Sequence, residues 1–64
     1  MGLREKIVSE KTLENYARAL GPRSLAAECL REYREDKDAG MKVQIVMANN
    51  GFRLVCRGDV RRFG

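Results

Sequence analysis

The hydrophobic period of this chain changes at Gly40, and that change most constrains what the chain can fold into. Before Gly40 the apolar residues recur at the three- and four-residue spacings of amphipathic helices, and after it they alternate with polar residues as in strands. Charge divides at the same place, since residues 1–40 carry eight basic and eight acidic side chains, whereas residues 41–64 carry five basic side chains against Asp59 alone. The sequence therefore predicts one small α+β domain, 1–64, in which a helical half supports a basic β-hairpin and tail.

Two or three short helices are expected in the first half. Residues 3–8 hold enough apolar side chains for one or two helical turns. Ser9 or Thr12 can cap the next helix, which Gly21 and the proline after it end. The segment 22–38 then has the pattern of one continuous, acid-rich helix, because no glycine interrupts it.

The second half predicts an antiparallel hairpin. Alternation begins at Met41, and Asn50-Gly51 is the dipeptide that two-residue turns with positive φ prefer. The expected cross-strand pairs are Met47 with Leu54 and Ile45 with Cys56. Gly58-Asp59 is expected to end the second strand, which leaves residues 60–63 as a short basic tail.

The sequence predicts neither an enzyme nor a metal or cofactor site. The chain has no histidine, which removes the commonest metal ligand and the usual general base. Cys29 and Cys56 have no CxxC spacing and each lies on the apolar face of its own element, so we interpret them as reduced, buried thiols, with a redox or metal role as the alternative. No apolar run is long enough to span a membrane, and a cytoplasmic setting is expected.

Uncompensated positive charge is the main functional signal. The candidate binding residues are Lys42, Arg53, Arg57, Arg61 and Arg62. Guanidinium groups pair with phosphates and carboxylates, so the predicted partner is a nucleic acid or an acidic protein surface. The alternative is that these side chains serve solubility and protect an edge strand from aggregation.

Phe63 lies next to the end of the tail, where no predicted element can bury it. It either frays or anchors on a partner surface. A domain of 64 residues with neither a metal site nor a probable disulfide has little reserve stability. We therefore expect a homodimer in which Phe63 is the self-association residue.

Four segments resemble, in order, the small Cro repressors of lambdoid phages. They are LENYARALG at 13–21, AGMKV at 39–43, NG at 50–51 and VRRF at 60–63. In that family a helix with a Leu-x-x-Tyr-Ala pattern precedes a helix-turn-helix, and a hairpin and a tail phenylalanine that packs into the partner subunit follow. The resemblance implies a small DNA-associated regulator and gives Phe63 its role as an anchor between subunits.

The segment 22–38 distinguishes two functions. The family has two short helices there, the second of which enters the major groove, and since this chain has no glycine in the segment, no base-reading residue is carried over. The first hypothesis is a cytoplasmic, Cro-like DNA-associated regulator that uses the basic hairpin and tail. The alternative is a non-enzymatic protein-binding inhibitor or adaptor encoded by a phage or mobile element. One uninterrupted helix favours protein binding, and a break near Leu30-Arg31 favours DNA reading.

Overall fold

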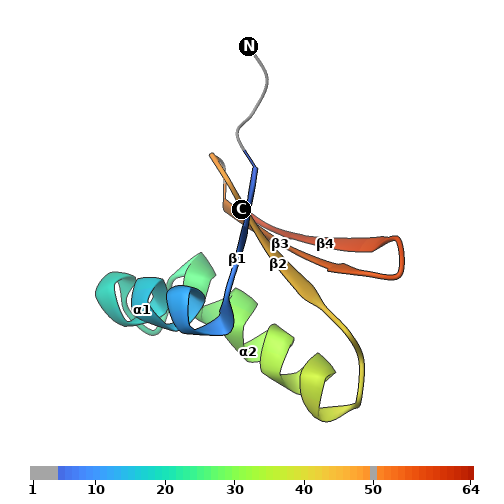
Figure 1. The fold of residues 1–64 in the computed structure, drawn as a ribbon. Helices are drawn as coiled ribbons and strands as arrows, with labels where there is room; N and C mark the ends of the chain where they lie inside the picture. The colour runs from blue at the N-terminus through green and yellow to red at the C-terminus, as the bar shows by residue number, and fades with distance from the viewer. Residues whose placement is uncertain (1–4, 50) are drawn as a thin grey trace.

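The computed structural model describes residues 5–49 and 51–64 and shows two helices on one side of a sheet (Figure 1). The elements are β1 (Lys6–Val8), α1 (Glu10–Leu20), α2 (Leu25–Asp38), β2 (Gln44–Ala48), β3 (Gly51–Cys56) and β4 (Asp59–Phe63). The four strands form an antiparallel sheet in the order β1-β2-β3-β4. The predicted α+β class is confirmed, but the described residues form four strands rather than a single hairpin.

Both helices begin at serine caps. The Ser9 hydroxyl accepts a hydrogen bond from the Thr12 backbone N–H at 3.2 Å, and the Ser24 hydroxyl accepts one from the Ala27 N–H at 3.2 Å. Gly21, with φ of 103°, ends α1. The second helix then runs unbroken to residue 38, as the absence of glycine predicted, but it begins at residue 25 rather than at residue 22 because Ser24 is its cap.

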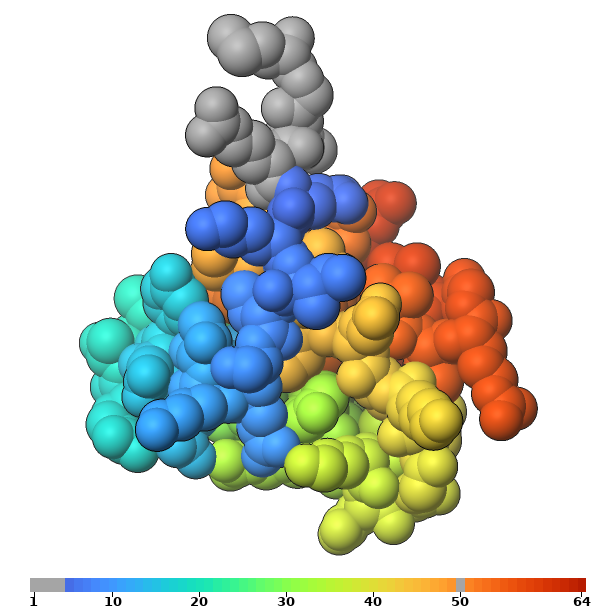
Figure 2. Space-filling view, viewed as in Figure 1, coloured from blue at the N-terminus to red at the C-terminus, as the bar shows by residue number. Residues whose placement is uncertain are grey.

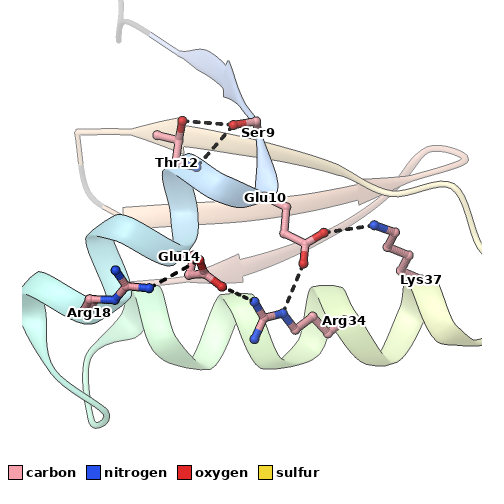
Figure 3. A network of polar contacts seen from close by, with 7 residues as sticks. All are labelled: Ser9, Glu10, Thr12, Glu14, Arg18, Arg34 and Lys37. Carbon is pink, nitrogen blue, oxygen red and sulfur yellow. Dashed lines mark hydrogen bonds and ion pairs between the residues drawn. The ribbon is translucent and has the colours of Figure 1, made fainter.

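Ion pairs join the two helices along their exposed edge (Figure 3). The Arg34 guanidinium donates to Glu10 at 3.2 Å and to Glu14 at 2.6 Å, and the Lys37 ammonium donates to Glu10 at 3.0 Å. These hydrogen bonds, first from Lys37 and then from Arg34, hold the pKa of Glu10 below its ordinary value. Each exposed pair adds little to stability, and the buried residues Leu13, Ala17, Ala26 and Leu30 pack the two helices together beneath them.

The core lies between the helices and one face of the sheet. Its buried residues are Leu13, Ala17, Ala26, Cys29, Leu30, Ile45, Phe52 and Leu54. The Tyr16 ring meets the Phe52 ring edge to face, with 6.2 Å between the ring centroids. The alternation predicted for the hairpin is therefore confirmed for Ile45, Phe52 and Leu54, which all face the helices.

The N-terminal segment forms a strand, so the prediction of a short helix there is wrong for the residues that the structure describes. Lys6 pairs with Met47 and Val8 pairs with Ile45, which makes β1 an edge strand beside β2. The backbone groups of β2 offer this segment hydrogen bonds that an isolated helical turn lacks, and Ile7 and Val8 are β-branched. The rest of the predicted helical segment, including Leu3, lies outside the described residues.

The register of the central hairpin differs from the prediction by two residues. Met47 pairs with Phe52 instead of Leu54, and Ile45 pairs with Leu54 instead of Cys56. Gly51 belongs to β3 opposite Ala48, while the other predicted turn residue, Asn50, lies outside the described residues. A shift of two residues keeps every side chain on the same face, so the hydrophobic pattern alone does not distinguish the two registers.

The predicted tail is a strand. Residues 59–63 pair with β3, and Phe63 lies opposite Phe52. Arg57 and Gly58 form the turn, with φ of 49° and 88°, and two positive φ values in succession are the signature of the tight hairpin turn that the sequence had assigned to Asn50-Gly51. The expected break at Gly58 is thus the turn of a second hairpin.

Candidate functional site

The sheet has one covered face and one open face. Directly opposed residues in antiparallel strands project to the same side, so the buried pair of Ile45 and Leu54 defines the side on which both helices lie (Figure 1). Two rows of side chains cross the other side, which we call the open face. The first row is Ile7, Val46, Arg53 and Arg62, and the second is Gln44, Val55 and Val60.

The structure separates the five predicted binding residues into three places. Arg53 and Arg62 lie opposite each other on the open face. Lys42 and Arg57 line one hollow at the end of the sheet. Arg61, paired with Leu54, lies on the side covered by the helices. The alternation that begins at Met41 would place Lys42 and Arg57 on the outer face of the hairpin, but Lys42 precedes β2 and Arg57 lies in the β3–β4 turn, so neither lies on a strand face.

Arg61 is engaged within the protein. Its guanidinium donates to Glu32 at 2.5 Å and also to Asp36, both on α2. The side chain of Asp36 is only 16% exposed, which makes this the least solvated ion pair in the described part of the chain. Arg61 therefore ties the edge strand β4 to α2.

Arg53 and Arg62 place two positive charges opposite each other on adjacent strands, an arrangement that destabilises a sheet unless another group compensates it. Arg53 pairs with Glu5, the residue just before β1. Among residues 5–49 and 51–64, Arg62 has no ion pair and its side chain is exposed. The sequence pattern gave no sign that Glu5 lies near Arg53, because β1 was not predicted.

The hollow at the end of the sheet has a volume of about 700 Å³. It lies between the loop that follows α2 and the β3–β4 turn, and Figure 2 shows that turn, in orange-red, projecting beyond the body of the molecule. Met41, Val43 and Val55 give it an apolar lining, with Lys42 and Arg57 as exposed cations. Met41 is 45% exposed, so its side chain offers apolar surface to an occupant of the hollow.

A third cation, Lys37, also lines the hollow, but it is already engaged. Its ammonium donates to Glu10 and lies 6.0 Å from the centroid of the Tyr33 ring. The hydrogen bond to Glu10 raises the pKa of Lys37 above its ordinary value, so this residue stays charged. Lys42 and Arg57 have no ion pair among the described residues, which makes them the available charges of the hollow.

The two cysteines differ in environment. Cys29 is buried in the core, and this burial raises the pKa of its thiol to about 11, so the thiol stays protonated. Cys56 is only partly buried, which corrects the prediction that both thiols are buried. Both are free, and no cluster of three or more potential metal ligands occurs in residues 5–49 and 51–64.

Phe63 has an element to pack within, contrary to the prediction. It lies in β4 opposite Phe52, is partly buried and packs against the core. Its carbonyl group lies directly over Gly51, where an added Cβ would collide with the carbonyl oxygen and lie 3.1 Å from the carbonyl carbon. Self-association through Phe63 stays a prediction, and its argument no longer includes an unpacked side chain.

Comparison of the chain with models of protein families, with curated proteins and with solved structures finds no match. Neither helix in the described part of the chain has the length and apolar character needed to cross a bilayer.

Proposed function

We propose that this chain is a non-enzymatic protein-binding module that docks the open face of its sheet on a larger partner. The observation that carries the proposal is the composition of that face, where aliphatic side chains lie beside arginines. Ile7 is 69% exposed and Val60 is 49% exposed, and Arg53 and Arg62 lie on the same face, Arg62 in the same strand as Val60. Exposed aliphatic side chains beside arginine are typical of protein interfaces, in which arginine is enriched.

Two features support a protein partner over a nucleic acid. Sheets that bind single-stranded nucleic acids stack bases on exposed aromatic rings, whereas Phe52 and Phe63 of this sheet face the helices. Helix-turn-helix proteins place a separate short helix in the major groove, whereas α2 runs without a break and bears Glu28, Glu35 and Asp38 as exposed carboxylates. Both features favour the protein-binding alternative.

Photocrosslinking tests this proposal. A benzophenone amino acid is placed at Ile7 on the open face, with Asn15, an exposed position on α1, as the matched control. The expected result in cells is a discrete, nuclease-resistant adduct from position 7 only. The adduct partner, once purified, should bind the parent chain more tightly than a Val60→Ser variant, because that change removes exposed apolar surface from the same face. Nuclease-sensitive adducts, or equal adducts from both positions, contradict the proposal.

DNA association is a second candidate, favoured by the positive charge of Lys42, Arg57 and Arg62. These three cations lack ion pairs among the described residues and are free to contact phosphates. A titration of random duplex DNA against salt tests it. An Arg57→Gln/Arg62→Gln double variant should reduce the slope of log affinity against log salt by about 0.9 for each lost phosphate contact. An unchanged slope contradicts DNA binding through these residues.

A further inference from the structure

The hollow at the end of the sheet combines apolar lining and charge in a way that specifies a ligand. Its volume of about 700 Å³ is within the range of small-ligand and side-chain pockets. Met41, Val43 and Val55 supply apolar surface, and the cations Lys37, Lys42 and Arg57 line it as well. No carboxylate is among the lining residues that the structure describes. An occupant that complements this lining must therefore present both apolar surface and negative charge.

We infer that this hollow binds an acidic peptide segment of the partner, with one apolar side chain inserted between Met41 and Val55 and with carboxylates paired to Lys42 and Arg57. The inference rests on the proposed protein-binding function and specifies the chemistry of the bound segment. A phosphate backbone satisfies the two free cations but leaves the exposed methionine and the valines uncovered. An acidic segment with an apolar residue satisfies both.

The backbone at Arg57 supports this assignment. Arg57 has φ of 49°, the left-handed region, in the first position of a tight turn that prefers asparagine, aspartate or glycine. A long arginine side chain is a costly choice there on grounds of folding alone, and strained residues concentrate at functional positions. The turn places Arg57 in the lining of the hollow, to which the loop before β2 contributes Lys42.

The test uses the full chain and the labelled heptapeptide Asp-Glu-Asp-Leu-Glu-Asp-Glu, with a second peptide in which serine replaces leucine. Binding is measured by fluorescence anisotropy, and the contact surface is mapped from backbone amide chemical shifts. The leucine peptide should bind more tightly and should shift the amides of Lys42, Val55 and Arg57. A Lys42→Gln/Arg57→Asn variant should bind it about tenfold more weakly. The matched control is Lys11→Gln/Arg31→Gln, which removes the same charge from exposed helix positions and should bind as the parent does.

The Arg57→Asn change alone provides a second readout. It should raise the melting temperature, because asparagine tolerates the left-handed conformation better than arginine does, while weakening peptide binding. A residue kept only for the fold would not show these opposite effects.

Several outcomes overturn the inference. Equal binding of the two peptides overturns it, and so does the absence of binding by either peptide. An equal loss of affinity in the Lys42→Gln/Arg57→Asn variant and in its control also overturns it. The last such result is duplex DNA that saturates the hollow without displacing either peptide. If the photocrosslinked partner still binds and perturbs the amides of Ile7 and Val46 but not those around the hollow, the open-face function stands and only the assignment to the hollow fails.

Discussion

Replacing Gly51 with alanine should destabilise the protein through the end of β4 rather than through the turn before β3. Gly51 has φ of 141°, which costs a residue with a side chain about 1–2 kcal/mol. The new methyl group would also collide with the carbonyl of Phe63. Relief of that collision requires the last residues of β4 to move away, which loosens the Phe63 side chain from the core.

The magnitude follows from these two costs. Complete burial of a phenylalanine contributes about 1.5–3 kcal/mol, and the partly buried Phe63 loses a fraction of this, about 1 kcal/mol. The total is about 2–3 kcal/mol. A domain of this length has a free energy of unfolding of about 3–10 kcal/mol, so the substitution removes a large part of it. The expected fall in melting temperature is about 10–20 °C.

Gly58→Ala is the matched control. Gly58 also has positive φ, at 88°, but apart from its chain neighbours no described residue lies within 4 Å of the position its Cβ would take. Alanine there incurs only the conformational cost, so Gly51→Ala should lower the free energy of unfolding by about 1 kcal/mol more. In a chain that ends at Arg62, the Phe63 carbonyl is absent, so the two substitutions should lower the free energy of unfolding equally. Equal costs for the two substitutions in the full chain, measured by urea unfolding, would refute the contact between Gly51 and Phe63.

The remaining predictions concern charge, thiol chemistry and assembly. Arg61→Ala should lower the free energy of unfolding by about 1 kcal/mol because the ion pairs with Glu32 and Asp36 are lost, whereas Arg62→Ala should have almost no effect. Equal effects of the two substitutions in urea unfolding would contradict the ion pairing of Arg61 with α2. Because the pKa of Glu10 is lowered in the folded state, the contribution of ionised Glu10 to the free energy of unfolding is complete above the ordinary pKa of 4.5 and is lost as the pH falls through the folded pKa. The difference in melting temperature between the parent and Glu10→Gln should therefore narrow in acid. Cys29, with its pKa raised to about 11, should resist alkylation until the protein unfolds, and rapid labelling in the native state contradicts its burial. The predicted homodimer should show a sedimentation coefficient that rises with concentration, and a monomer throughout would end that prediction.

The helices could be predicted from the sequence because their determinants are local. Ser9 and Ser24 cap them, Gly21 ends the first, and the spacing of the apolar residues identifies the buried Leu13 and Ala17, although Leu20 on the same stripe is 63% exposed. The strands depended on distant partners. Residues 6–8 are too few to show a period, and only their pairing with β2 makes them a strand. The predicted register of the central hairpin was wrong because two registers that differ by two residues bury the same side chains.

The sequence identified the basic residues of the second half as candidates, but not how the fold distributes them over the surface. Arg61 and Arg62 are adjacent and identical in the sequence, yet one projects toward acidic residues of α2 and the other toward solvent. Their roles follow from strand alternation, which required knowing that residues 59–63 form a strand. The apolar lining of the hollow, such as Val55, could not be predicted. The hollow lies between the loop before β2 and the turn at Arg57 and Gly58, and the sequence did not predict a turn there.

The position of β1 in the sheet also shapes how this chain folds. β2, β3 and β4 follow one another along residues 44–63 and are joined by tight connections, so their pairing closes only short loops. Pairing of β1 with β2 closes a much longer loop that contains both helices, since Lys6 pairs with Met47. Three residues hold it there. Transient opening should therefore begin with the detachment of β1 from this edge. Detachment exposes the backbone groups of β2 to amide exchange and to β1 of another molecule, so domain swapping would start at this edge.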